Sequence, residues 1–421
     1  MRRYFGTDGV RGIVGRDLTP ALVERLGRAV TLWQGGGAVL VGRDTRASGR
    51  ELERAFASGV ASAGGNAMLA GVLPTPAVAL LALDLGAVIT ASHNPPEYNG
   101  VKFFDGQGQK LSDEAEEEIE ALLGEPPRNA DEGQIDNLDV VHGSYVDHVI
   151  ERFGEDLEEL RIGVDCANGA YSGIAPAAFE RLGACVTAIG DSPDGTNINV
   201  GCGATDLRAL QQIVAREGLD LGVAFDGDGD RMLAVDERGQ VVDGDQILAA
   251  LALDRNVDMV AVTTMANLGL HRLMEERGIR VVTTDVGDRY VLEALRREGG
   301  VLGGEQSGHL IYLDGHVTGD GLVAALLLCN ALHGRKLSEV VAVMDRFPQV
   351  MENVRVADKA LTPAIEERVE ATNSALAGRG RVLVRPSGTE PVVRVLAEAE
   401  NEEEARNLCA TIASLVSEEL G

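Results

Sequence analysis

One hydrophobic pattern occurs three times in the chain. An apolar, β-branched run at 38–41, 162–165 and 259–262 ends in a polar turn and passes into a segment of helical period. The helices that follow are expected at 51–60, 174–182 and 271–277. Successive copies lie about a domain length apart, farther than the roughly 20 to 50 residues of a solenoid repeat. The pattern therefore predicts three related domains in which strands and helices alternate.

The order of these elements predicts the type of sheet. A strand, a helix and a further apolar strand such as 281–282 follow one another directly, which is typical of crossover connections in a mixed or parallel sheet. After residue 350 the order changes, and a small C-terminal α+β domain is expected. Its predicted elements are strands 351–356, 381–384 and 392–397 and helices 363–376 and 402–420. We predict four domains, at 1–145, 146–245, 246–350 and 351–421.

The charge of the chain argues against two classes of partner. Of its 421 residues, 66 are acidic and 38 are basic, which gives a net charge of −28. This charge repels nucleic acid and anionic lipid, so we expect neither nucleic acid nor membrane as a partner. An anionic ligand would need a local cluster of Arg and Lys. The acidic segments 113–125 and 398–404 are assigned to solubility.

The cysteines and the apolar runs predict a compartment. The five cysteines are odd in number and scattered, without a C-x-x-C pair, so neither a disulfide framework nor a zinc site is indicated. The longest apolar run, 322–329, is far shorter than the roughly 20 residues that a bilayer requires. We expect a cytoplasmic protein with no export signal.

The string 226–231, Asp-Gly-Asp-Gly-Asp-Arg, is the most informative motif. Alternate residues of an extended strand lie about 6.6 Å apart, whereas neighbouring ligands of an octahedral ion lie about 3 Å apart. Gly227 and Gly229 permit the curl that would bring Asp226, Asp228 and Asp230 together, and three carboxylates suit Mg²⁺. The alternatives are a solvated acidic turn and an EF-hand loop, and the second fails because Arg231 occupies the sixth position, where that loop needs glycine.

A second string, 88–102, presents Ser92 and His93 on a loop. A predicted strand ends at Thr90, and Pro95-Pro96 forbids regular structure after it. By itself the serine is more often a local backbone partner than a nucleophile, and the chain has no G-x-S-x-G elbow.

A third string, 385–394, is a candidate anion site. It holds two guanidiniums, two hydroxyls and a glycine within ten residues, although a surface turn with incidental charges would look the same. The chain contains no Walker loop.

A fourth string, 303–309, is Gly-Gly-Glu-Gln-Ser-Gly-His. Glu305 could accept hydrogen bonds from two vicinal hydroxyls of a polyol, and His309 could be a general acid/base or an additional phosphate donor.

In this order, the four strings resemble the α-D-phosphohexomutase superfamily, and the resemblance runs from the string 5–12, Phe-Gly-Thr-Asp-Gly-Val-Arg-Gly, to the loop at Arg385. Gln306, where relatives that act on mannose or glucose usually carry Met, and the string 286–291 favour the branch that acts on glucosamine phosphates. The resemblance implies four domains around a central cleft and Mg²⁺ as cofactor.

The resemblance also implies roles for individual residues. Ser92 would carry a phosphoryl group and share Mg²⁺ with Asp226, Asp228 and Asp230. The residues that would line the transfer centre are Arg11, His93, Lys102, Arg231 and His309. Lys102 is the first candidate for proton exchange and His309 the second. The substrate would be bound through Glu305, Ser307, Arg385, Ser387, Gly388, Thr389 and Arg394.

The implied reaction interconverts α-D-glucosamine 6-phosphate and glucosamine 1-phosphate through a bisphosphate, for synthesis of UDP-N-acetylglucosamine, by a monomer or homodimer. Three alternatives remain: a mutase of mannose and glucose phosphates, a non-catalytic sugar-phosphate-binding protein, and a metal-dependent phosphatase with an aspartate nucleophile.

Overall fold

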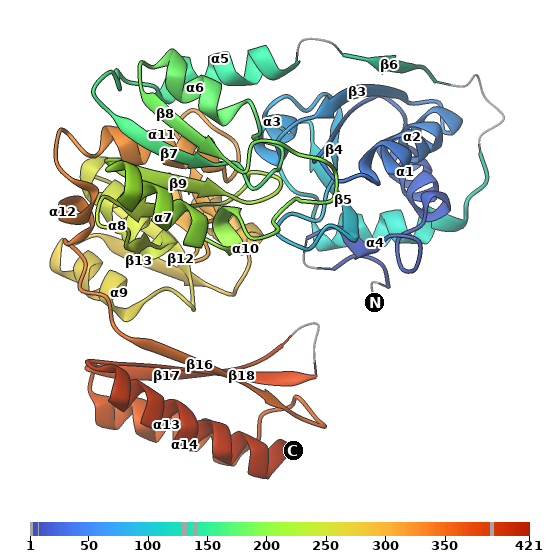
Figure 1. Ribbon diagram of the computed structural model, residues 1–421. Coiled ribbons are helices and arrows are strands. Elements are labelled where there is room, and N and C mark those ends of the chain that lie inside the picture. The colour runs from blue at the N-terminus through green and yellow to red at the C-terminus, as the bar shows by residue number, and fades with distance from the viewer. Residues whose placement is uncertain (1–2, 7, 128–132, 139–140, 388–390) are drawn as a thin grey trace. The chain divides into compact units, whose positions relative to one another are not determined.

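The structure is a computed structural model that describes residues 3–6, 8–127, 133–138, 141–387 and 391–421. The chain divides into two compact units (Figure 1). One consists of Met1–Thr264 with Arg280–Ala342, and the other of Met265–Ile279 with Val343–Gly421. Within the described residues, the first unit holds three sheets and the second holds one.

The first sheet has the strand order β1-β5-β4-β2-β3-β6. Its strands are β1 (Val10–Ile13), β2 (Ala38–Arg43), β3 (Asn66–Val72), β4 (Leu85–Ile89), β5 (Tyr98–Asp105) and β6 (Ile135–Asn137). The same part of the chain forms α1 (Pro20–Gln34), α2 (Gly49–Ser62), α3 (Thr75–Leu80), α4 (Asp113–Ala121) and the 3-10 helix η1 (Leu122–Gly124). Strand β4 is parallel to β2 and antiparallel to β5, with Val88 opposite Lys102. This register places Lys102 beside the end of β4, where the chain enters the loop that holds Ser92.

The second sheet has the order β11-β10-β9-β7-β8. Its strands are β7 (Arg161–Asp165), β8 (Cys185–Ile189), β9 (Leu221–Phe225), β10 (Met232–Asp236) and β11 (Val241–Val242). The accompanying helices are α5 (Val141–Phe153), α6 (Ala175–Arg181), η2 (Gly203–Thr205) and α7 (Arg208–Glu217). Strands β9 and β10 are antiparallel, and Phe225 pairs with Met232. The aspartate string between them is therefore a short loop whose two ends are fixed by the ladder.

The third sheet has the order β13-β12-β14-β15. Its strands are β12 (Met259–Thr263), β13 (Arg280–Thr284), β14 (Leu302–Gly304) and β15 (Leu310–Tyr312). Its helices are α8 (Gly244–Asp254), α10 (Asp288–Glu298), α11 (Gly321–Asn330) and α12 (Leu337–Val341). The apolar run 322–329 is the buried helix α11, which Asp320 caps by accepting from the backbone amides of Leu322 and Val323. Within the part of the chain that the structure describes, no helix is long and apolar enough to cross a membrane.

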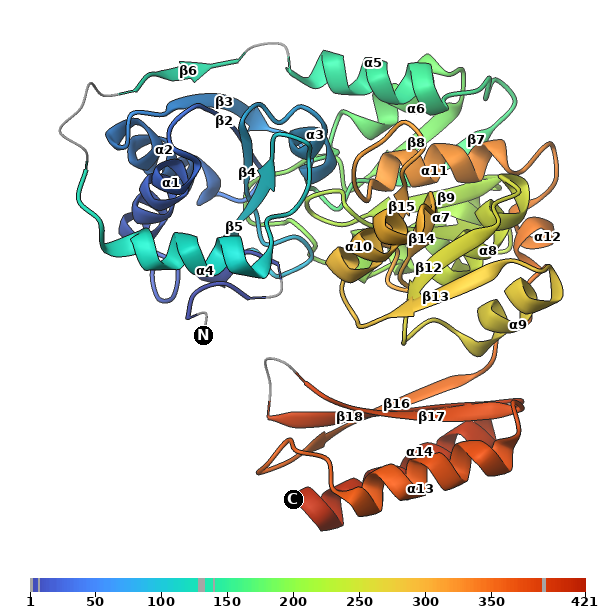
Figure 2. The same ribbon diagram turned by 180° about the vertical axis from the view of Figure 1, so that it is seen from behind.

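The C-terminal unit contains a three-stranded antiparallel sheet in the order β16-β18-β17. Its strands are β16 (Gln349–Arg355), β17 (Gly380–Pro386) and β18 (Val392–Ala399), and its helices are α9 (Leu268–Glu276), α13 (Pro363–Leu376) and α14 (Glu402–Leu420). Helices α13 and α14 lie on the same face of the sheet (Figure 2). Their apolar sides enclose a core that includes Ile365, Val395 and Val416.

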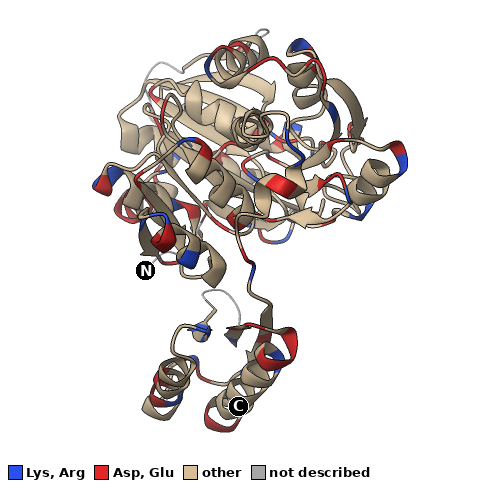
Figure 3. Cartoon of the chain, turned by 90° about the vertical axis from the view of Figure 1, so that its left-hand side faces the viewer, with Lys and Arg blue, Asp and Glu red and all other residues tan. Residues whose placement is uncertain are grey.

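Asp and Glu are spread over helices and loops of both units (Figure 3). In the two acidic segments assigned to solubility, several carboxylates form hydrogen bonds or ion pairs within the protein. Glu116 is buried and bonds to Arg289 at 3.0 Å. Glu120 accepts the backbone amides of residues 3–5. Glu398 is fully buried and forms an ion pair with Arg381. The solubility assignment is therefore wrong for these carboxylates: Glu116 and Glu120 bind segments distant in sequence, and Glu398 pairs with the residue opposite it on β17.

Candidate active site

Ser92 lies just beyond the end of β4 with its side chain directed at the aspartate loop. The residue is buried, and its φ of 52° is in the left-handed region that non-glycine residues rarely adopt. Its amide donates to Thr90 Oγ1 at 2.9 Å, and its Oγ donates to Asp226 Oδ2 at 2.6 Å. His93 Nδ1 lies 3.2 Å from the same Oγ. A serine of the first sheet and an aspartate of the second therefore share one hydrogen bond.

The three aspartates converge as the glycine spacing predicts. Oxygens of Asp226, Asp228 and Asp230 all lie within 4.8 Å of one another, and the three residues are buried. The turn depends on Gly229, which has a φ of +79° and whose added Cβ would lie 2.4 Å from the ring of Tyr171. A larger residue there would be strained and would also collide with a buried ring.

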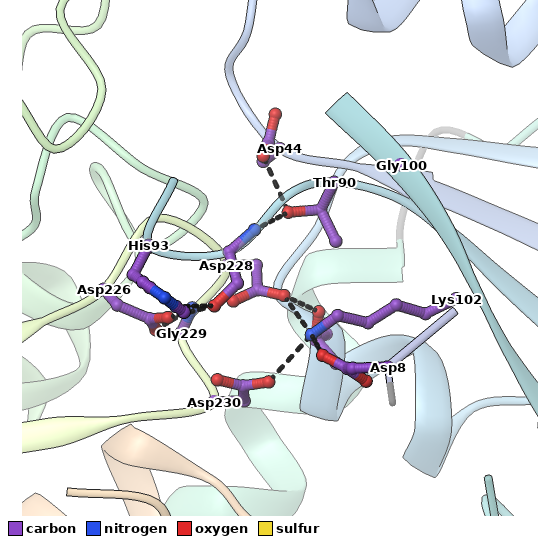
Figure 4. A network of polar contacts seen from close by, with 12 residues as sticks. Asp8, Asp44, Thr90, His93, Gly100, Lys102, Asp226, Asp228, Gly229 and Asp230 are labelled. Carbon is purple, nitrogen blue, oxygen red and sulfur yellow. Dashed lines mark hydrogen bonds and ion pairs between the residues drawn. The ribbon is translucent and has the colours of Figure 1, made fainter. Parts of the chain in front are cut away.

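Lys102 is the main counter-charge of this cluster (Figure 4). Its Nζ lies 2.8 Å from Asp228, 2.9 Å from Asp230 and 3.0 Å from Asp8. Burial disfavours the ammonium, but these three carboxylates outweigh burial and raise the pKa of Lys102 well above its usual range. Lys102 is therefore a fixed positive charge at neutral pH.

Asp226, Asp228 and Asp230 together carry more negative charge than the single positive charge of Lys102 can neutralise. Burial, followed by the charges of Asp230 and Asp228, raises the pKa of Asp226 well above its usual range. Asp228 Oδ1 and Asp230 Oδ1 are buried and have no hydrogen-bond partner among the described residues. Carboxylate oxygens are hard ligands that suit Mg²⁺. The two unsatisfied oxygens, the raised pKa and the adjacent Ser92 hydroxyl together fit a divalent cation.

A second charged cluster surrounds His309, and the sequence reasoning missed most of it. His309 is buried, with Nδ1 3.7 Å from Asp230 Oδ1 and Nε2 3.3 Å from Asp288 Oδ2. Lys110 Nζ lies 2.5 Å from Asp288 and 2.7 Å from Asp8. Burial disfavours the imidazolium, but Asp288 and Asp230 outweigh it and raise the pKa of His309. Asp8 and Asp288 lie within the strings 5–12 and 286–291 but had no role assigned to them, whereas Lys110 belongs to none of the quoted strings.

Two arginines and His93 lie next to the aspartates and Ser92. Arg11 pairs with Asp8, and Arg231 Nε lies 3.9 Å from Asp230 Oδ1. Burial, together with the charges of Arg231 and Arg11, lowers the pKa of His93 to about 4. His93 is therefore a neutral imidazole beside Ser92 at physiological pH.

Glu305 and Ser307 lie on the turn between β14 and β15. Glu305 accepts the amide of Gly287 at 2.8 Å, and Ser307 Oγ lies 3.4 Å from the other oxygen of Glu305. Ser307 is exposed and Glu305 is half-buried. Their polar atoms are open to a ligand, although the hydrogen bond from Gly287 also gives Glu305 a structural role.

The predicted anion site lies in the C-terminal unit. Arg385 on β17 pairs directly with Arg394 on β18, which places two like charges side by side on one sheet. Like charges directly opposite each other on a sheet repel, and a bound anion would offset that repulsion. The backbone carbonyl of the buried Ser387 accepts from Lys359 Nζ at 2.8 Å. The other two residues predicted for this site, Gly388 and Thr389, lie outside the described residues.

Comparison with known proteins identifies the class. Residues 2–128, 143–239, 243–347 and 351–415 match domains I, II, III and IV of the phosphoglucomutase/phosphomannomutase family, the last as its C-terminal domain. The chain belongs to this family of enzymes, and the prediction of four α/β domains is confirmed. The exact boundaries stay a prediction.

Within the family, two relatives that match over nearly the full length are both named phosphoglucosamine mutase. A phosphoglucosamine mutase of Moorella thermoacetica is 49% identical over 99% of this chain and 100% of its own length. One from Thermobifida fusca is 49% identical over 100% of this chain and 99% of its own. The resemblance to the glucosamine branch is therefore confirmed.

Solved structures agree with this class. A phosphoglucomutase/phosphomannomutase family protein from Burkholderia thailandensis has a TM-score of 0.83 and 25% identity, covering 98% of this chain and 97% of its own. An N-acetylphosphoglucosamine mutase from Aspergillus fumigatus, solved with GlcNAc-6P and magnesium, has a TM-score of 0.72, covering 99% of this chain and 96% of its own. At 20% identity, the second structure supports the fold alone.

Proposed function

We propose that the protein interconverts α-D-glucosamine 6-phosphate and α-D-glucosamine 1-phosphate through phosphorylated Ser92 and a bisphosphate intermediate. One observation carries the proposal: Ser92 Oγ lies 2.6 Å from Asp226 Oδ2, within a cluster of three buried carboxylates. A hydroxyl next to a divalent-cation site is suited to hold a transferable phosphoryl group.

Each half of the reaction exchanges one bond to phosphorus. In the first, the Ser92 Oγ–P bond breaks, a bond forms to O1 or O6 of the hexosamine phosphate, and the attacking hydroxyl loses its proton to a base. The bisphosphate then turns end for end. In the second, the other phosphate returns to Ser92 Oγ, and the departing sugar oxygen regains a proton.

Charge neutralisation is the main task of the site, because phosphoryl transfer depends on positioning and electrostatics. Mg²⁺ held by Asp226, Asp228 and Asp230 would offset the charge on the phosphoryl oxygens. Lys102, Arg11 and Arg231 add fixed positive charge around Ser92.

Proton exchange is assigned to a histidine in this proposal. The raised pKa of Lys102 disfavours our sequence-based first choice, because an ammonium cannot accept a proton. His309 is the better candidate to give a proton to the departing sugar oxygen, because Asp288 and Asp230 outweigh burial, raise its pKa and favour the imidazolium. His93 is suited to exchange a proton with Ser92 Oγ, which lies 3.2 Å from its Nδ1.

The remaining residues are proposed to bind substrate. Glu305 and Ser307 would bind sugar hydroxyls, and the C-terminal residues would hold the phosphate that does not react. We propose synthesis of UDP-N-acetylglucosamine in the cytoplasm as the physiological context. The five free cysteines suit that reducing compartment.

Substrate comparison tests the proposal. We expect kcat/KM for glucosamine 6-phosphate to exceed that for glucose or mannose 6-phosphate by at least about tenfold, or about 1.4 kcal/mol. A tenfold preference for a neutral sugar would favour the phosphomannomutase/phosphoglucomutase alternative. Release of inorganic phosphate with label on Asp226 would indicate a phosphatase, and absence of turnover on all three sugars would indicate a binding protein.

Arg385→Met tests the proposed phosphate site. Loss of one charge-assisted contact of about 1.5–3 kcal/mol should raise KM for glucosamine 6-phosphate roughly 10- to 100-fold. Steady-state kinetics would measure this, with Arg379→Met as a control that removes an exposed guanidinium of the same domain. Equal KM values for the two variants would contradict this binding role.

A further inference from the structure

Arg46 is a fully buried arginine between β2 and α2 that the proposed reaction does not use. Its side chain is 0% exposed and pairs with Asp44, also 0% exposed, at 2.8 Å. Burial of a guanidinium is costly unless each of its N–H groups finds an acceptor. The acceptors of Arg46 therefore indicate why a buried charge is kept here.

Almost all of these acceptors belong to the Ser92 loop. Nη2 donates to the carbonyls of Ser92 at 3.0 Å and Asn94 at 2.8 Å. Nη1 donates to the carbonyls of Tyr98, at 3.0 Å, and of Pro95. With Nε on Asp44, the five N–H donors of the guanidinium are all used. One side chain thus satisfies four carbonyls, three in the loop that holds Ser92 and one at Tyr98, where β5 begins.

The loop needs this support because of its backbone conformation. Ser92 is held at a φ of 52°, and the neighbouring Pro95-Pro96 pair has no amide donors of its own. The buried carbonyl oxygen of Ser92 therefore needs hydrogen-bond donors from outside the loop. Arg46 and Asn199 Nδ2, at 2.9 Å, supply them.

Asp44 connects the arginine to the other side of the same serine. Asp44 Oδ2 accepts from both Arg46 Nε and Thr90 Oγ1, the latter at 2.7 Å. Thr90 Oγ1 in turn accepts the amide of Ser92 at 2.9 Å. The Asp44–Arg46 pair therefore fixes both backbone groups of Ser92. Arg46 binds the carbonyl directly, and Asp44 holds the amide through the hydroxyl of Thr90.

We propose that Arg46, oriented by Asp44, is a positioning residue that holds Ser92 with its Oγ directed at Asp226 and thereby sets the rate of phosphoryl transfer. The inference rests on the proposed function, because it assumes that Ser92 is the group that is phosphorylated. Arg46 acts through the loop backbone and touches neither substrate nor metal. Its loss should therefore lower kcat and leave KM nearly unchanged.

The chain offers a matched control in Arg43. Its Nε pairs with Glu53 at 3.3 Å, with side chains 11% and 9% exposed, at the end of β2 and close to Arg46 in sequence. Its other hydrogen bond goes to the carbonyl of Asp44. Arg43→Met thus removes a comparably buried guanidinium that makes no hydrogen bond to the Ser92 loop.

The test compares Arg46→Met, Arg46→Lys and Arg43→Met in the full chain with Mg²⁺. Each is mixed with glucosamine 1,6-bisphosphate, quenched over time and analysed by mass spectrometry for phosphate on Ser92. We expect both Arg46 variants to be phosphorylated at least about 100-fold more slowly than wild type, since lysine cannot bind four carbonyls. kcat should fall in parallel with an unchanged KM, while Arg43→Met keeps the wild-type rate even if its Tm falls.

Hydrogen–deuterium exchange of the 90–98 peptide supplies a readout that does not depend on the chemistry. We expect faster exchange there in both Arg46 variants and no change in Arg43→Met. If Arg46→Met does not fold, Arg46→Lys carries both measurements. Wild-type phosphorylation rates in a folded Arg46 variant, or an equal loss in Arg43→Met, would overturn the proposal. A wild-type protein that takes no phosphate would instead contradict the proposed function, and exchange in the 90–98 peptide would still show whether Arg46 holds the loop.

Discussion

Ser92→Ala is expected to be folded and almost inactive. Removing the hydroxyl that we propose accepts the phosphoryl group should lower kcat by at least on the order of 10³-fold, because loss of a covalent nucleophile is among the largest single effects in catalysis. The side chain contributes two polar contacts, to Asp226 and His93, so the effect on Tm should be small. Mutase turnover and thermal unfolding, measured on the same preparation, would check both expectations.

The matched control for this variant is Ser62→Ala. Ser62 is a partly buried serine of α2 whose Oγ bonds to the carbonyl of Gly59 and to Arg28. It should retain wild-type turnover. A Ser92→Ala protein that turns over substrate at a comparable rate would show that the phosphoryl group is carried elsewhere.

Asp228→Asn is expected to weaken Mg²⁺ binding at least about tenfold and to lower turnover with it. The amide has nearly the same shape as the carboxylate but lacks the charge that attracts the cation. Asp228 Oδ2 already accepts from Thr75 and Lys102, so the unpartnered Oδ1 is the oxygen available to a metal. Titration calorimetry with Mg²⁺ would measure the affinity, and the rise of Tm on adding Mg²⁺ provides a second measure because a ligand stabilises the state that binds it.

Asp236→Asn is the control for losing a buried carboxylate in the same sheet. Asp236 Oδ1 accepts the amides of Arg238 and Gln240, away from the triad. This variant should lose stability but keep its Mg²⁺ affinity. Unchanged Mg²⁺ binding by Asp228→Asn would rule out this carboxylate as a ligand.

The sequence predicted those parts of the site in which the backbone conformation depends on the type of residue at one or two positions. The two glycines between aspartates predicted a curl, and Gly229 adopts the positive φ that such a curl needs. Helix α13 has the predicted bounds, and in the structure Thr362 caps it and a proline occupies its first turn. Such signals depend on neighbours in sequence, so they can be recognised before the fold is known.

The residues that the sequence did not predict acquire their roles only through long-range contacts. Lys110 and Asp288 are ordinary charged residues, and their ion pair joins positions 178 apart in sequence. Arg46 is 46 positions from Ser92, and it contacts the serine only once the chain has folded. Glu116 lies in a segment whose acidic composition suggested solvent exposure, yet it pairs with Arg289, 173 positions away.

The proposed reaction requires a phosphoryl group on Ser92. Wild-type protein incubated with glucosamine 1,6-bisphosphate and Mg²⁺ should gain the mass of one phosphate, and peptide fragmentation should assign that phosphate to Ser92. Ser92→Ala treated in the same way should gain nothing. A phosphate found on Asp226, or an equal gain of mass in both proteins, would contradict the account.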